Sequence, residues 1–237
     1  MKETLIDLFS EYGIVFFLCL AIVAGILGIY YENKRQKEIT KNLNLYAKSN
    51  HYEIYNNDYN MNKLHIPKVF EQGHGITIKN VLIKREEMYN TYWGDHFFTT
   101  GSGKSSQSHN CSFVAIECNR LQFPSFFVRD ENAIFDYLGK LFGGQDINFS
   151  GDDDFSPKFV LQGDSESRIR SLFTAKVRRA FTYNVACSGY RIYGNMHSIL
   201  IEQEKQIDNI NDRIKFEQKL KNIFSVIYSE LTKEEIV

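Results

Sequence analysis

The chain has 237 residues, with 28 Lys or Arg and 29 Asp or Glu, so its formal net charge is −1. This length excludes a mini-protein and fits one large domain with appendages. The near-zero charge argues against a general nucleic-acid binder, which carries a strongly basic surface. Four cysteines without a CxxC spacing exclude a zinc ribbon and a dense disulfide framework.

Residues 13–31 form an apolar run without a charge or a proline. As a helix this run is about 28 Å long, which matches the hydrocarbon core of a bilayer. A cleaved signal peptide needs a basic start, a shorter run and a small-x-small cleavage site. Here the start is acidic, and a buried core helix seldom lacks a polar face over such a length. We therefore predict an uncleaved transmembrane helix at 13–31 in contact with the lipid bilayer, with 1–12 as its N-terminal flank.

Basic residues follow this run directly, at Lys34, Arg35 and Lys37, whereas Lys2 is the one basic residue before it. By the positive-inside rule, the C-terminal side of the helix lies in the cytoplasm. We expect a single-pass protein of the bacterial inner (plasma) membrane, with residues 1–12 outside and the soluble domain in the cytoplasm. Sparse cysteines are consistent with that reducing compartment.

A juxtamembrane helix is predicted at 32–50 and a soluble α+β domain at 51–204. Short runs rich in Val, Ile, Phe and Tyr predict strands at 75–85, 89–100, 109–120 and 125–129. The second and third runs are joined by the polar sequence GSGKSSQS, which predicts a hairpin with a long loop.

Apolar residues then recur at helical spacing in three places. They predict helices at 131–141, 164–181 and 205–231, the last being a long amphipathic helix within the C-terminal segment 205–237. Further strands are predicted at 159–161, around Cys187 and Ile192, and at 198–202. Strands followed by interspersed helices favour an α+β fold, with a mainly antiparallel sheet and packed helices behind the transmembrane helix.

Gly103, Lys104 and Ser105 match the end of a phosphate-binding loop. The full motif requires a glycine at the place of Phe98 and a helix after the serine. The run that follows is apolar and predicts a strand. We therefore interpret 101–108 as a cationic hairpin tip, with contact to anionic headgroups as the alternative.

Residues 146–154 resemble the start of a calcium-binding EF-hand loop, with oxygen-bearing side chains at alternate positions, including Asp152 and Asp154, and glycine at the sixth. The twelfth position requires a bidentate glutamate and is Pro157. A solvated acidic turn is the favoured interpretation, and a weak cation site or acid–base carboxylates are the alternatives.

His96, His109 and Cys111 are the remaining candidates for metal binding or nucleophilic catalysis. If the hairpin pairs residue 96 with residue 109, the two imidazoles meet across it. Facing histidines more often form a cross-strand contact than a metal site, and no further ligand is identifiable. A Cys–His nucleophile likewise lacks a supporting local motif.

Several short motifs together resemble a family of uncharacterised bacterial single-pass membrane proteins. They are FFTTGSGK at 97–104 with His109, FFVR at 126–129, LFGGQDINF at 141–149, and shorter matches at 155–156, 161–164 and 172–173. The resemblance covers residues 76–192 and implies a transmembrane segment before a soluble domain. It assigns no activity and no catalytic residue. The Asn- and Lys-rich segments and the long final helix depart from the family.

These features favour a non-enzymatic binding or scaffold module at the cytoplasmic membrane face, because no catalytic constellation assembles from the sequence. We expect no cofactor, no bound metal and no nucleic-acid partner. The rival hypothesis is a membrane-associated hydrolase or metal-dependent enzyme that uses His96, His109, Cys111 or the Asp152 cluster. A protein partner, or a homo-oligomer assembled through the helix 205–231, is the third hypothesis.

Overall fold

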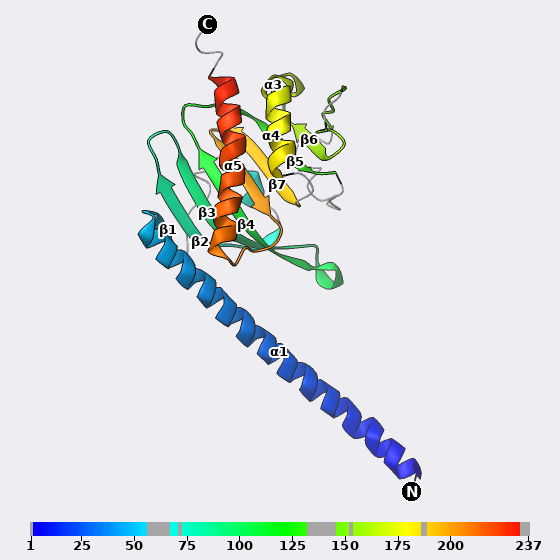
Figure 1. The fold of residues 1–237 in the computed structure, drawn as a ribbon. Coiled ribbons are helices and arrows are strands. Elements are labelled where there is room, and N and C mark those ends of the chain that lie inside the picture. Colours follow the sequence, from blue (N-terminus) through cyan, green and yellow to red (C-terminus); the bar gives the residue numbers. More distant parts are fainter. Residues whose placement is uncertain are drawn as a thin grey trace. The chain divides into compact units, whose positions relative to one another are not determined.

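A computed structural model describes residues 2–55, 67–70, 73–131, 146–151, 154–185 and 189–232. The chain divides into two compact units, Met1–Leu45 and Tyr46–Val237. The first unit is helical, and the second contains a sheet with helices packed on it (Figure 1).

The helix α1 (Lys2–Ser49) is continuous and passes through the boundaries expected at residues 12 and 31. In the described part of the chain, the segment Val15–Ser49 is the one helix long and apolar enough to cross a membrane. Between Val15 and Tyr31 its large apolar side chains are exposed; Phe17 is 69% exposed and Ile29 66%. A continuous exposed apolar surface of this kind marks a site of contact with a membrane or another protein.

The second unit is built on an eight-stranded sheet with the order β1-β2-β3-β4-β8-β7-β5-β6, in which every neighbouring pair is antiparallel. The predicted α+β class is confirmed. The strands are β1 (Glu53–Tyr55), β2 (His74–Arg85), β3 (Asn90–Thr100), β4 (Gln107–Glu117), β5 (Phe123–Asp130), β6 (Phe159–Gly163), β7 (Tyr190–Met196) and β8 (Ser198–Gln203).

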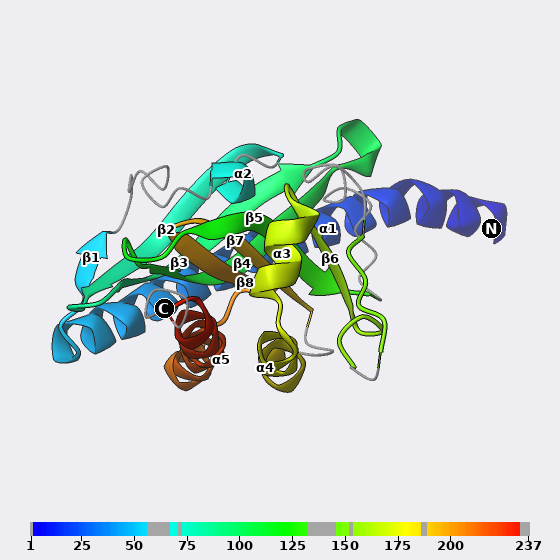
Figure 2. The same ribbon diagram turned by 90° about the horizontal axis from the view of Figure 1, so that it is seen from above.

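One face of the sheet packs under the short helix α2 (Pro67–Phe70), seen above the sheet in Figure 2. The hydrophobic core between α2 and the sheet contains Phe70, Phe113, Phe127, Tyr193 and Leu200. Strand residues at period two supply this face, which explains the β-branched and aromatic runs of the sequence.

The opposite face carries α3 (Glu166–Leu172), α4 (Ala175–Val185) and α5 (Ile210–Leu231), and Figure 2 shows α4 and α5 on the side away from α2. The apolar stripe of α5 is buried against this unit through Phe216, Leu220, Ile223, Phe224 and Ile227. That stripe is therefore used within the chain and is not a free surface for a homo-oligomer. Ile214, an apolar residue of the same helix, is 39% exposed.

The last helix begins five residues later than the sequence predicts, at Ile210 instead of residue 205. Lys205 forms a bridge to Asn110, and the backbone N–H of Ile207 donates to Ser112 Oγ at 2.9 Å. These contacts tie 205–207 to β4, and Asn209 caps the helix by accepting from the backbone of Asn211 at 2.7 Å.

The single helix predicted at 164–181 is two helices, because the chain turns at Phe173. The Phe173 side chain is fully buried and its ψ of 57° is not helical. Thr174 caps the start of the second helix, because its hydroxyl accepts from the Val177 N–H at 3.4 Å. The predicted helix 131–141 and the strand around Cys187 lie outside the described residues.

Candidate functional site

The structure places His96, His109 and Cys111 on the α2 face of the sheet, on β3 and β4. The register pairs His96 with Cys111 and Phe98 with His109. The pairing of 96 with 109 is therefore wrong by two residues, and the imidazoles do not face each other across the hairpin. The Phe98 ring lies between them instead, with ring centroids 4.6 Å from each.

Two residues from other strands complete a buried polar network around His96. Glu202 on β8 accepts from His96 Nδ1 at 3.0 Å and pairs with the Arg191 guanidinium of β7 at 3.0 Å. Arg191 also donates to the Cys111 sulfur at 3.1 Å, and the Cys111 thiol donates to the Glu204 carbonyl at 3.7 Å. Since an ionised carboxylate only accepts, the proton on His96 lies on Nδ1.

The charges in this network stabilise one another. Burial acts to raise the pKa of Glu202, but the Arg191 guanidinium and the His96 hydrogen bond outweigh it, so that pKa is lowered. Burial acts to lower the pKa of Arg191, but Glu202 together with Tyr193, Cys111 and Glu204 outweighs it, so that pKa is raised. Glu202 is therefore an ionised carboxylate that is paired with Arg191 and accepts a hydrogen bond from His96.

The cysteine in the network is a poor nucleophile. Burial, followed by the charge of Glu202, raises the pKa of the Cys111 thiol. Its side chain has no exposed surface, and that of His96 has none either. A thiol attacks as the thiolate, so a buried thiol with a raised pKa is typical of a structural residue.

His109 lies on the same face near the start of β4 and bonds to the Thr100 hydroxyl at 2.8 Å. Burial, and then the positive charge of Arg191, lowers the pKa of His109. Within the described ranges, no three His, Cys, Asp or Glu side chains cluster closely enough to hold a metal ion.

The described residues of the acidic turn form hydrogen bonds and ion pairs with residues other than His96, His109 and Cys111. Asp154 is exposed and pairs with Lys158 at 3.4 Å, while Asp152 lies outside the described residues. Asp146, the first position of the EF-hand-like pattern, accepts from Gln162 on β6 at 2.8 Å. The Asp146 carboxylate therefore bonds to the edge strand β6 and does not point into a cation-binding loop.

The hairpin tip at 101–106 contains the short helix η2 (Gly103–Ser105) and leads into β4. The Ser105 N–H and hydroxyl both donate to the Ser102 carbonyl, at 3.2 and 2.9 Å. This geometry confirms that a strand follows Gly103-Lys104-Ser105, so the helix N-terminus that a phosphate-binding loop needs is absent from this described segment.

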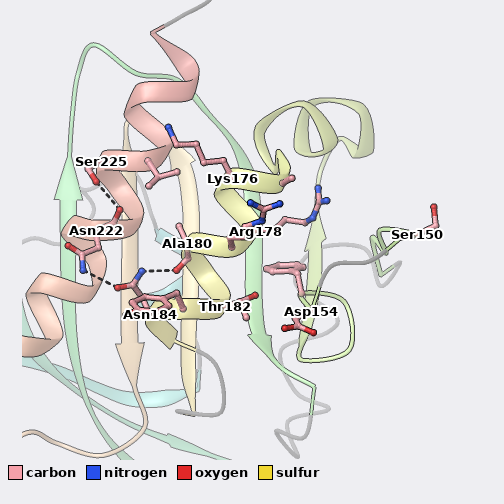
Figure 3. A pocket seen from close by; sticks show the side chains of 15 residues that line it. Ser150, Asp154, Lys176, Arg178, Ala180, Thr182, Asn184, Asn222 and Ser225 are labelled. Atoms are coloured by element: carbon pink, nitrogen blue, oxygen red, sulfur yellow. Dashed lines mark hydrogen bonds between the residues drawn. The ribbon is translucent and has the colours of Figure 1, made fainter.

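A groove of about 1020 Å³ lies along α4, between α5 and the turn that contains Asp154. Figure 3 shows Asn222 and Ser225 of α5 on one side of α4, with Asn222 beside Asn184, and Arg178 and Thr182 on the side of α4 toward Asp154. Asn222 Nδ2 donates to Asn184 Oδ1 at 3.0 Å, and Lys219 Nζ donates to the Asn184 carbonyl at 2.7 Å. These bonds join the two helices at one end of the groove.

The charged side chains that line this groove are mainly basic. Lys176 pairs with Glu230 at 3.5 Å, and Arg178 donates to the Phe173 carbonyl at 2.7 Å while lying 4.2 Å from the centre of the Phe149 ring. Arg179 is exposed and forms no ion pair or hydrogen bond with its side chain in the part of the chain that the structure describes. Tyr183, beside it on α4, is 91% exposed.

No family model matches the sequence, and no curated protein matches it. Among solved structures, the chain is similar to the crystal structure of the mycobacterial trehalose monomycolate transport factor A, TtfA. The two share 10% sequence identity, with 80% of this chain and 92% of that chain covered and a TM-score of 0.48. A likeness at this level carries no argument about function.

Sequence reasoning missed Glu202, Arg191 and the α4–α5 groove. Glu202 follows the apolar run Ile199–Leu200–Ile201 within β8, and Arg191 is the second residue of β7. A charged side chain inside a buried strand must be paired, so an acid and a base in two apolar strands were the available sequence signal for this ion pair. The sequence contains no comparable signal for the groove, because the groove depends on how distant segments pack.

Proposed function

We propose that this chain is a single-pass, membrane-anchored binding module that acts without catalysing a reaction. Its α1 segment lies in the bacterial inner membrane, and the unit Tyr46–Val237 lies at the cytoplasmic face. The family resemblance of the motifs at 97–104 and 141–149 agrees with this arrangement and belongs to the same proposal.

The anchor is supported by the exposed apolar surface of α1 between Val15 and Tyr31. Exposed Phe and Ile side chains of this density are stable in hydrocarbon and costly in water. The orientation is supported by the charges after the run: Lys34 and Lys37 are exposed, and Arg35 pairs with Glu32 at 3.0 Å.

The non-enzymatic role is supported by one observation above the others. The candidate side chains His96 and Cys111, which are the most reactive types in the core, are enclosed with Glu202 and hydrogen-bonded or ion-paired within the sheet. A catalytic group must reach its substrate, whereas these groups stabilise the packing of β3, β4, β7 and β8.

Two experiments test the proposal. Carbonate extraction of cell membranes should leave the full chain in the pellet and release a variant that lacks residues 13–31. For orientation, Ser106→Cys should resist a membrane-impermeant maleimide in intact cells and react after permeabilisation, while Glu3→Cys should react in both. The unmodified chain gives the labelling background. Labelling of Ser106→Cys in intact cells would reverse the orientation, and release of the full chain by carbonate would remove the anchor.

A further inference from the structure

The groove along α4 and α5 combines positive charge with a recessed shape. Among the described residues its lining presents the basic side chains of Lys176, Arg178 and Arg179 and one acid, Asp154; Asp154 is paired with Lys158 and Lys176 with Glu230, so Arg179 is the basic group without an ion pair in that described lining. A cleft lined by one sign of charge concentrates its field and attracts a ligand of the opposite sign.

The groove also offers contact groups that the fold does not use. Tyr183 is 91% exposed, and neither its hydroxyl nor that of Thr182 forms a hydrogen bond within the described ranges. Exposed tyrosine and arginine are the residue types that most often supply binding energy at protein interfaces. Here Arg179 and Tyr183 lie one helical turn apart on the same element.

From these observations we propose that the groove binds an acidic segment of a protein partner, with Arg179 pairing to a carboxylate and Tyr183 packing on the segment. This inference rests on the proposed role as a binding module and names its surface. An extended or helical peptide fills a recess of about 1020 Å³ that runs along α4 from α5 to the turn containing Asp154. A flat layer of lipid headgroups contacts the rims of such a recess and leaves its interior unfilled.

The test uses the full chain in phosphatidylcholine nanodiscs and a fluorescein-labelled peptide of alternating glutamate and alanine. Fluorescence anisotropy should show binding that weakens with added salt and is absent for the same peptide with glutamine in place of glutamate. Arg179→Glu should weaken binding about threefold to tenfold, and Tyr183→Ala about fivefold. Arg179→Lys should retain most of the affinity, since the charge is kept.

The matched control is Lys104→Glu, which makes the same charge change on the exposed hairpin tip. It should leave peptide binding within about twofold of the unmodified chain. Because Arg179 and Tyr183 are exposed, neither variant should change the melting curve followed by Trp93 fluorescence.

Three results would overturn the inference. The first is absence of peptide binding, and the second is equal weakening by Arg179→Glu and Lys104→Glu, which indicates net charge alone. The third is that Arg179→Glu abolishes co-sedimentation with phosphatidylserine vesicles while peptide binding is unchanged, which assigns the groove to lipid headgroups. Each is distinct from failure of membrane anchoring, which carbonate extraction measures.

Discussion

The Arg213 guanidinium of α5 donates to Asp95 Oδ1 of β3 across 2.7 Å, and both side chains are buried. Asp95 also accepts from Asn80 at 2.8 Å, Ser112 at 2.7 Å and Gln206 at 2.9 Å. One carboxylate therefore joins β2, β4, the segment before α5 and α5 itself. This cluster fixes where the last helix crosses the sheet, and so fixes one wall of the groove.

Replacing Asp95 should destabilise the fold strongly. Asp95→Ala leaves the Arg213 charge buried without its partner, for which we expect a loss of about 3–5 kcal/mol in the free energy of unfolding. Urea unfolding of the full chain in mild detergent, followed by the fluorescence of the single tryptophan Trp93, measures it. The double variant Asp95→Leu with Arg213→Met should lose less, because no charge stays buried.

Asp212 provides the control for this prediction, because it pairs with Lys215 on the exposed side of the same helix turn. Asp212→Ala should cost less than about 1 kcal/mol. Equal losses for Asp95→Ala and Asp212→Ala would show that the buried cluster contributes little.

Glu202 should make the fold sensitive to acid. Its pKa in the folded chain is lowered from the ordinary value of 4.5, despite burial, by Arg191 and His96. The folded state therefore favours the ionised form, and the resulting stability is present above pH 4.5 and is lost as the pH falls through the lowered pKa. Glu202→Gln should be less stable by about 3 kcal/mol at neutral pH, and the difference from the unmodified chain should shrink in acid.

The measurement is urea unfolding at a series of pH values, with Glu166→Gln as the control. Glu166 is exposed and pairs with Arg170 on α3, so its replacement should leave the pH profile unchanged. A constant difference between Glu202→Gln and the unmodified chain down to strong acid would contradict the lowered pKa.

Cys111 should resist alkylation in the native protein, because the thiol is buried and its pKa is raised. Iodoacetamide at mildly alkaline pH, followed by peptide mass spectrometry, should find Cys111 unmodified until urea unfolds the chain. Rapid native alkylation of Cys111 would instead favour the rival hypothesis of a cysteine-dependent enzyme.

Gly94 on β3 should not tolerate a side chain. A Cβ at this position would overlap the Phe113 ring on the paired strand β4. We expect Gly94→Ala to cost about 1–3 kcal/mol, and the added replacement Phe113→Leu to recover part of that loss by making room.

Thermal melting followed by Trp93 fluorescence reports this change. Gly28→Ala is the control, since a Cβ there has no neighbour within 4 Å. Unchanged melting of Gly94→Ala would show that the Phe113 ring moves aside without cost.

The local pattern of the sequence was enough to predict the apolar run at 13–31, the long hairpin around Gly101 and the α+β class. Each depends on residues close together in the chain: an uninterrupted apolar run, alternation at period two, or a polar loop between two apolar strands. The helix break at Phe173 and the start of α5 at Ile210 were not predictable in this way. The burial of Phe173 and the bond from Ile207 to Ser112 involve partners far away in the sequence.

Only the tertiary structure decided the register between β3 and β4 and the residues that surround His96. A shift of two residues keeps every side chain on its face, so alternation cannot distinguish a His96–His109 pair from the observed His96–Cys111 pair. Glu202, Arg191 and the α4–α5 groove likewise come from segments up to about a hundred residues apart. The sequence by itself determined a long apolar helix and the kind of domain that follows it. Long-range packing decided which polar groups are enclosed and which basic ones stay open to a partner.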